Sequence, residues 1–228
     1  MEERNGREER QEQWLEELLR TADDDTKMTE KQLRIVNAAM EVFVEKGYSG
    51  SSTSEIAAKA GVAEGTIFRH YKTKKDLLFS IVTPIVAKLV APFVMKDFYR
   101  VLDAPYSTYE SFLRAVLRNR IDFIHKHLPA LRIFLQEIPF QEELREPFKD
   151  MVAANIIPRL RNVAERFQAQ GSLRVDFPPE SIVRLTMTNI LGFLLARYFL
   201  LPEYAWDDEA EIERTIDFII HGLGAPRA

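Results

Sequence analysis

The sequence predicts an all-α protein in which a three-helix head precedes a bundle of about six helices. Apolar residues recur at spacings of three and four along most of the chain, which is the repeat of helices with one buried face. Pairs of Ser or Thr with Glu, Gln or Asp three residues later precede several of these stretches, and such pairs cap the first turn of a helix. No segment keeps the apolar and polar alternation that indicates a strand.

The first helix of the head begins after Thr29, which is expected to form a capping box with Gln32. An apolar face then continues as far as Gly47, where the helix is expected to end. The members of this face are Ile35, Ala39, Val42 and Phe43. Their spacing predicts a helix that packs against the next two.

Two short helices around a glycine turn follow directly. Ser52 with Glu55 predicts a second capping box, so a helix begins at Thr53. Gly61 is expected to end this helix in the left-handed conformation, which glycine adopts at little cost. Residues 64–71 then form another short helix, with its apolar residues four apart.

A third capping box, Thr73 with Asp76, begins the next helix and places Lys74 and Lys75 in its first turn. Cations at that end oppose the helix dipole, which suggests an anionic partner such as phosphate. Two short helices joined by a turn, here within residues 53–72, are the arrangement that places a helix in the major groove of DNA.

Beyond residue 78 the apolar repeat stays helical and is divided by prolines and capping pairs. Pro84 and Pro92 are expected to kink or segment residues 74–99. The further helices expected run from the box of Ser107 with Glu110 to about His127, from Pro129 through Glu137, from about Gln141 with a bend near Pro147 or Pro158 to Gly171, from Pro178 and Pro179 to Leu201, and from Asp208 to His221.

Charge is distributed unevenly along this chain, whose net charge is -4. Residues 1–26 carry 4 basic and 10 acidic side chains, net -6, whereas residues 27–79 carry 9 and 6, net +3. Positive charge is therefore concentrated where nucleic acid would bind. The predicted organisation is a charged extension over residues 1–28, helical or disordered, a DNA-binding head over 29–78 and a second domain over 79–228.

Several other chemistries are not expected. A chain without cysteine has no disulfide or thiol nucleophile and suits the cytoplasm. The longest apolar run, residues 190–201, has 12 residues, fewer than the about 20 that span a bilayer, so no membrane partner is expected. His125 and His127 have no evident third ligand, and phosphate-binding glycine motifs and hydrolase motifs are missing. No metal, cofactor or catalytic residue is therefore predicted.

The string from Ile35 to Leu78 resembles the tetracycline-repressor (TetR) family of bacterial transcriptional regulators. The matching motifs are AA-x-x-x-F-x-x-x-G-Y, I-A-x-x-A-G-V and G-T-x-x-x-H-Y-x-x-K. With the groove argument above, the resemblance implies that the DNA-binding residues are Ser52, Thr53, Ala63, Glu64, Gly65, Thr66, Phe68, Arg69, His70, Lys72 and Lys74.

Three positions depart from the family pattern. Ala63 and Glu64 stand where the family commonly has Ser and Lys, and Phe68 stands where Tyr is usual. Glu64 can accept a hydrogen bond from a cytosine amino group, and Phe68 can contact a thymine methyl. The operator sequence is therefore not expected to follow that of relatives.

A homodimer is predicted, because one short helix reads only a few base pairs and a two-fold dimer reads two half-sites of a palindrome. The family resemblance implies the same arrangement. Two strongly apolar C-terminal helices are the expected seam, through Ile190, Phe193, Leu194, Arg197, Ile212, Ile216, Ile219 and Ile220.

The resemblance also implies an effector site in the middle helices, where many of the 15 phenylalanines lie. Each Phe alone suits ordinary core packing, but together they favour an apolar ligand. The candidate lining residues are Phe79, Phe93, Phe98, Phe112, Phe123 and Phe134.

The leading hypothesis is a cytoplasmic regulator, a repressor, that binds double-stranded operator DNA and is released by a hydrophobic small molecule. The alternative is a DNA-bound regulator that a protein partner controls through the acidic extension, without a small-molecule effector.

Overall fold

The computed structural model describes residues 29–90 and 92–224, and side chains from 83 to 96 lie outside this description. Within these residues the fold is all-α, as the sequence predicts, and no strand is present apart from one isolated bridge between Leu173 and Gly224. The predicted extension over residues 1–28 lies outside the described residues.

The chain divides into two compact units, each with its own core. Of the described residues, one unit comprises 29–90 together with 126–147, and the other comprises 92–125 and 148–224. The first unit therefore contains the head and also a later segment of chain. A boundary at residue 78 falls inside helix α5, Lys74–Val90, rather than between elements.

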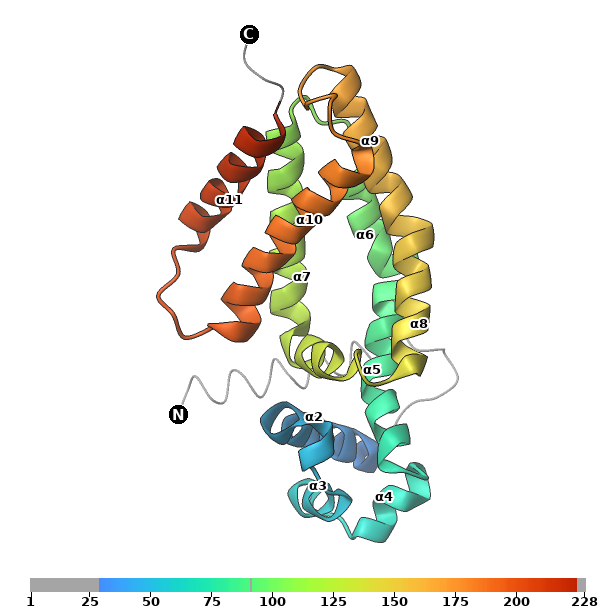
Figure 1. The fold of residues 1–228 in the computed structure, drawn as a ribbon. Helices are drawn as coiled ribbons and strands as arrows, with labels where there is room; N and C mark the ends of the chain where they lie inside the picture. The colour runs from blue at the N-terminus through green and yellow to red at the C-terminus, as the bar shows by residue number, and fades with distance from the viewer. Residues whose placement is uncertain (1–28, 91, 225–228) are drawn as a thin grey trace. The chain divides into compact units, whose positions relative to one another are not determined.

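In the first unit, the head consists of α2 (Glu30–Gly50), α3 (Thr53–Ala60) and α4 (Glu64–His70), followed by α5 (Figure 1). The Thr29 and Gln32 capping box is present with both of its hydrogen bonds. Gly47 interrupts α2 with a φ of 71°, so its last turn follows a kink at the residue where the sequence predicts the end. Helix α2 packs against α3 and α5 through a fully buried face that includes Ile35 and Phe43.

The second unit contains α6 (Pro92–Asp103), α9 (Ile157–Ala169), α10 (Pro179–Leu195) and α11 (Asp208–Leu223), with the first part of α7 (Tyr109–Glu137). In Figure 1, α11 lies beside α10, and α10 crosses α9. Pro178 is the N-cap residue of α10, as the sequence predicts. A short π-helical turn, η2 (Ala196–Leu200), continues α10.

The core of this second unit is aromatic where α7, α9 and α10 meet. The Tyr109 ring stacks on Phe112 with centroids 5.6 Å apart and meets Phe167 edge-on at 5.3 Å. The Tyr109 hydroxyl and Thr186 Oγ1, both buried, form a hydrogen bond of 2.8 Å. The buried hydroxyls of Tyr109 and Thr186 are therefore paired with each other, as buried groups require.

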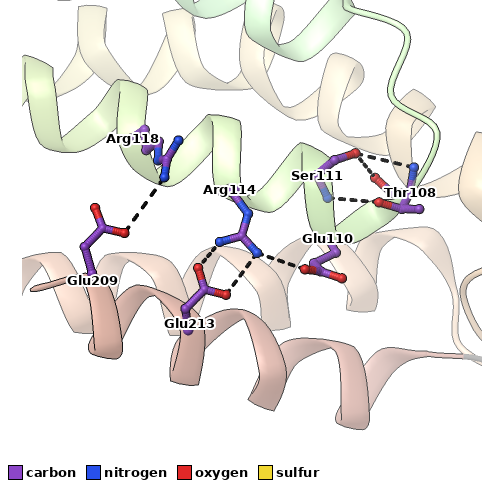
Figure 2. A network of polar contacts seen from close by, with 7 residues as sticks. All are labelled: Thr108, Glu110, Ser111, Arg114, Arg118, Glu209 and Glu213. Carbon is purple, nitrogen blue, oxygen red and sulfur yellow. Dashed lines mark hydrogen bonds and ion pairs between the residues drawn. The ribbon is translucent and has the colours of Figure 1, made fainter.

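An ion-pair ladder joins α7 to α11 on the surface of the same unit. Figure 2 shows Arg114 between Glu110, on its own helix, and Glu213 on α11, with Arg118 facing Glu209 one turn along. Exposed pairs of this kind each contribute about 0.2–1 kcal/mol. Their main effect is to fix the register of α11 along α7.

Helix α7 differs from the prediction in its start and in the expected break between His127 and Pro129. Helix α7 is capped by Thr108, whose Oγ1 accepts from Ser111 N at 3.1 Å, and not by Ser107 with Glu110. The same helix continues through Pro129 to Glu137, where two separate helices were expected. The corrections share one cause, because a buried apolar face outweighs a local start or stop signal.

The long helix expected from about Gln141 is present but is divided. Helix α8 (Glu142–Met151) is followed by a π-helical turn, η1 (Val152–Ile156), and then by α9. This wider turn lies directly before Pro158, which has no backbone N–H to donate. The interruption is therefore at the second of the two predicted prolines, and Gly171 follows α9 with a φ of 70°.

Candidate nucleic-acid interface

The turn between α3 and α4 has the backbone geometry predicted for it. Gly61 is left-handed, with φ 65° and ψ 37°, and its N–H donates to the carbonyls of Ala57 and Ala58. Val62 N donates to Ala57 O at 3.0 Å. These bonds close the end of α3, and the chain enters α4 after three residues, Gly61 to Ala63.

The start of α3 is capped by half of the predicted box. Ser52 Oγ accepts from Glu55 N at 3.2 Å, while the Glu55 carboxylate forms an ion pair with Lys46 of α2. Hydrogen bonding to Glu55 raises the pKa of Lys46. Glu55 therefore joins α3 to α2 instead of completing its own cap.

Helix α4 presents one buried and one exposed face. Ile67 and the following Tyr71 are buried against the head, whereas Phe68 is 46% exposed. The side chains exposed with Phe68 are Glu64, Arg69 and His70, and Gly65 is exposed beside them. Thr66 is half-buried. The α4 residues of the predicted DNA-binding set thus lie on or beside the solvent-facing side of this helix.

Glu64 is held by the neighbouring helix. Thr53 Oγ1, at the start of α3, donates to Glu64 Oε1 at 2.5 Å. The contact links two residues of the predicted set across the turn. A base reaching Glu64 would find one carboxylate oxygen already occupied and the other available for an amino group.

Ala63 is the N-cap residue of α4 and offers no side-chain hydrogen bond. Its extended conformation, φ -69° and ψ 144°, is that of an ordinary N-cap, and its carbonyl accepts from Thr66 N at 2.8 Å. The departure from the family pattern therefore costs a capping hydrogen bond but does not change the backbone.

Lys74, whose ammonium is predicted to contact phosphate, has partners within the chain. Its ammonium donates to the carbonyl oxygens of Tyr48 at 2.7 Å and Ser51 at 2.8 Å, and it lies 4.4 Å from the centre of the Tyr48 ring. These acceptors belong to the end of α2 and the residue after it. Lys74 therefore joins the end of α2 to the residue before α3, and its contact with phosphate stays a prediction.

Lys75 and Lys72 have different surroundings. The full Thr73 and Asp76 box is present, with bonds of 2.9 and 3.0 Å, and it orients this turn. Lys75 Nζ lies 2.7 Å from Glu143 Oε1 at the start of α8. Lys72 and Arg69 are exposed and form no ion pair with the described residues. The cations open to an anion here are thus Arg69 and Lys72, with His70 beside them.

The six phenylalanines predicted to line one effector pocket are divided between the two units. Phe79 and Phe134 belong to the unit of the head, and Phe98, Phe112 and Phe123 to the second unit. The side chain of Phe93 lies outside the described residues. Phe112 is part of the packed Tyr109 cluster, so it is a core residue of its unit.

The residues predicted for the dimer seam are mostly core residues of the single chain. Those already buried within it are Ile190, Leu194, Ile212, Ile216 and Ile219. Phe193 and Ile220 are half-buried, and Arg197 pairs with Asp208 at 2.5 Å. These five side chains have little surface left to bury against a second copy, and the more exposed residues of this face are different ones. The predicted seam stays a prediction.

The exposed apolar residues of α10, η2 and α11 were missed by the apolar-stripe argument. Leu191 is 54% exposed and Phe218 66%, with Leu195 and Leu200 also exposed. A shallow surface cavity of about 290 Å³ lies between α10 and α11, lined by Asn189, Glu211, Arg214, Thr215 and Phe218. The signal available in sequence was the apolar character of α10 on nearly every side.

The same helix is apolar enough to be compared with a membrane span. The segment Pro179–Leu200 is long enough and apolar enough to cross a membrane, with a mean hydropathy of 1.2. In the structure α10 packs against α9 and α11, which covers one side of it. The remaining side is the exposed apolar surface just described.

Comparisons with known proteins agree with this architecture. Residues 35–81 match the family model described as bacterial regulatory proteins, tetR family. The chain is 40% identical over 169 residues to the HTH-type transcriptional regulator SrpR of Pseudomonas putida, a match covering 72% of this chain and 74% of SrpR. It is 49% identical over 51 residues to a fatty acid metabolism regulator protein of Bacillus subtilis, covering 22% of this chain and only 26% of that protein.

A solved structure shares the fold over most of the chain. The transcriptional regulator FadR of Bacillus subtilis, in complex with stearoyl-CoA, superposes with a TM-score of 0.55 at 22% identity. The superposition covers 83% of this chain and 98% of that one. The likeness extends from the head into the helices that follow it.

Proposed function

Because this chain belongs to the tetR family of bacterial regulatory proteins and is a transcriptional regulator, we propose that it is a ligand-responsive repressor. In this proposal it binds a palindromic operator as a homodimer and is released by a hydrophobic small molecule. The observation that carries the proposal is the exposed face of α4, whose side chains are available to DNA while its opposite face is buried.

Base recognition is assigned to Glu64, Phe68 and Arg69. Arg69 has the geometry to donate two hydrogen bonds to a guanine edge, and Phe68 supplies apolar contact for a thymine methyl. Glu64 keeps one carboxylate oxygen beyond its bond to Thr53. Glycine at position 65 adds no side chain, so the backbone of α4 can approach the groove closely.

Phosphate contact is assigned to Lys72 and His70, with the backbone N–H groups at the start of α3 as further donors. Ser52 and Thr53 belong to that helix start, and Ser52 is exposed. Lys75 would have to leave Glu143 before it could bind phosphate. Lys74 is not assigned to phosphate, because its ammonium already donates to the carbonyls of Tyr48 and Ser51.

Dimerisation is assigned to the exposed apolar face of α10 and α11. Leu191 and Leu195 are four residues apart and share one side of α10, and Phe218 is exposed on α11. Exposed apolar patches of this kind are typical of protein interfaces. A two-fold axis through the face would make it self-complementary, and a two-fold dimer reads the two half-sites of a palindrome.

Release by an effector follows from differential binding. The dimer has one conformation that spans both half-sites and one that does not. A ligand lowers operator affinity only if it binds the second conformation more tightly than the first. The stearoyl-CoA complex of a protein with the same fold supports an apolar ligand. The aromatic interior of the second unit offers the matching chemistry.

The test begins with selection of binding sites from random DNA, followed by fluorescence anisotropy on the selected sequence. Arg69→Ala is expected to lower specific affinity by about tenfold and to relax preference at one position. Lys72→Ala should weaken all DNA alike and reduce the salt slope by about 1. Phe140→Ala, a variant at an 80% exposed residue away from α4, is the control. Unchanged sequence preference in Arg69→Ala and in Glu64→Ala would refute the assignment of α4 as the reading helix.

A further inference from the structure

Arg120 of α7 is a half-buried arginine whose guanidinium contacts two aromatic side chains of the second unit. Its guanidinium carbon lies 3.9 Å from the centre of the Phe98 ring, on α6, and 5.0 Å from the centre of the Phe123 ring. Phe98 is itself 5% exposed. Two of the phenylalanines predicted to line an effector site, Phe98 and Phe123, are therefore in cation–π contact with the Arg120 guanidinium.

This cation has no carboxylate partner among the described residues. Arg120 Nε and Nη2 donate to the amide oxygen of Asn119 at 3.1 and 2.5 Å, and Arg120 forms no ion pair there. The stretch from 83 to 96, whose side chains are not described, contains no Asp or Glu. Burial without a counter-charge lowers the pKa of Arg120 to about 10.

The other arginines of the same stretch of α7 are arranged differently. Arg114 lies between two glutamates and Arg118 faces a third, all toward α11 (Figure 2). Among the described residues, glutamates thus pair with Arg114 and Arg118 and not with Arg120. A protein seldom keeps a buried charge with a neutral partner alone, because burial of an unpaired ion is costly.

The geometry around Arg120 suits an incoming anion. Aromatic rings that stack on a guanidinium contact its faces, whereas its N–H groups point outward in its own plane. Nη1 has no hydrogen bond to the described residues, and Nη2 is shared only with a neutral amide. A carboxylate or phosphate can therefore take two N–H groups side by side, and the rings offer apolar surface to the rest of the ligand.

We propose that Arg120 is the anion-binding group of the effector site, and that the effector is an apolar molecule with one anionic head, a carboxylate or a phosphate ester. The proposal rests on the proposed function for the existence of an effector. It adds the charge of the ligand and the residue that recognises it. Asn119 is a positioning residue, which holds the guanidinium in the plane that the anion meets.

The test compares three ligands with the same twelve-carbon chain: dodecanoate, dodecyl phosphate and dodecan-1-ol. Binding to the full chain is measured by isothermal titration calorimetry for the wild type, Arg120→Met and Arg120→Lys. Arg118→Met, at an exposed arginine of the same helix, is the matched control.

The wild type is expected to bind at least one of the two anions at least about tenfold more tightly than the alcohol. Arg120→Met should lose that preference and keep the affinity for dodecan-1-ol, Arg120→Lys should retain part of it, and Arg118→Met should match the wild type. Preference for dodecanoate identifies a carboxylate head, and preference for dodecyl phosphate a phosphate head. Equal affinity of wild type and Arg120→Met for both anions would overturn the proposal, as would a wild type that binds neither.

Thermal denaturation without ligand separates binding from a structural role. Arg120→Met is expected to melt at or above the wild-type temperature, since an apolar residue removes a half-buried charge that has no counter-charge among the described residues. A large decrease in Tm would overturn the proposal by assigning Arg120 to the fold. Operator binding by Arg120→Met should be intact without ligand. Failure of the wild type to bind any DNA would count against the proposed function. The calorimetric result on Arg120 would still be valid.

Discussion

Lys74 and Lys75 are adjacent in sequence, but their ammonium groups bind different partners. Lys74 donates to the carbonyl oxygens of Tyr48, near the end of α2, and of Ser51, the residue that follows this helix. Lys75 forms an exposed ion pair with Glu143, on a segment 68 residues further along the chain. The first contact maintains the head, and the second joins the head to the later part of its own unit.

Replacing Lys74 by Met is therefore expected to destabilise the head by about 2 kcal/mol, because two charge-assisted hydrogen bonds are lost. Lys75→Met is the matched control and should cost less than about 1 kcal/mol, as exposed ion pairs do. Urea unfolding followed by circular dichroism measures both. Equal effects of the two substitutions would contradict the structural role of Lys74.

The buried phenol of Tyr109 is expected to lower the free energy of unfolding at alkaline pH. Burial raises the pKa of this phenol to about 12, above the about 10 of an unfolded tyrosine. The folded state then binds the proton more tightly, so its contribution is complete below pH 10 and is lost as pH rises through 12. The loss amounts to about 3 kcal/mol across that interval.

The measurement is urea unfolding at pH 8, 10 and 11.5 for the wild type and Tyr109→Phe. The variant lacks the ionising group, so the advantage of the wild type should shrink as pH rises and reverse by pH 11.5, where ionisation has cost the wild type about 2 kcal/mol. At pH 8 the variant should be less stable by about 1 kcal/mol, because Thr186 loses its partner. Tyr204→Phe, at an exposed tyrosine, should follow the wild type at every pH.

At the scale of the element, capping signals and glycines predicted the start and end of the head helices because these signals act within one turn. Thr29, Thr73 and Gly61 have the roles that their sequence neighbours indicate. Thr108 was missed because Ser107, one residue earlier, is an equally good cap. A choice between caps worth about 1 kcal/mol each is made by the burial of Tyr109 and Phe112.

The uncapped start of α4 gives a prediction at this scale. Ala63→Ser is expected to stabilise the protein by about 1 kcal/mol, because the extended backbone at this position lets a hydroxyl accept from the next turn. Ala58→Ser, at an exposed position inside α3, is the control and should be neutral or slightly destabilising. Differential scanning calorimetry of both variants checks this; no gain from Ala63→Ser would show that the start of α4 is already satisfied.

At the scale of the molecule, the composition of a helix predicts that it is covered but not which face meets which partner. The stripe of Ile212, Ile216 and Ile219 is the most regular in the C-terminal helix, and it packs into the chain's own core. Leu191 and Phe218 are isolated apolar residues by comparison, yet they are the exposed ones. Assigning faces requires the three-dimensional arrangement of α9, α10 and α11. The same applies to Arg120, whose lack of a carboxylate is evident only when its neighbours are known.

The exposed face predicts the oligomeric state. Leu191→Glu combined with Phe218→Glu should convert a dimer into a monomer, because two charges per chain would be buried against each other. Val175→Glu, at another exposed apolar residue of the same unit, is the control and should leave the mass unchanged. Light scattering after size-exclusion chromatography at micromolar concentration measures the mass. A wild-type monomer, or a dimer unaffected by the double substitution, would contradict the assignment.

Helix α7 passes from one compact unit into the other without a break, and Pro129 lies four residues past His125, the last residue of the second unit's share. Proline has no amide hydrogen, so the carbonyl of His125 has no donor four residues ahead. Amide hydrogens on either side of this position should exchange with deuterium faster than those near Leu113 and Leu117, which are fully buried. Exchange rates along this one helix would then report, in a single experiment, how independently the two units open.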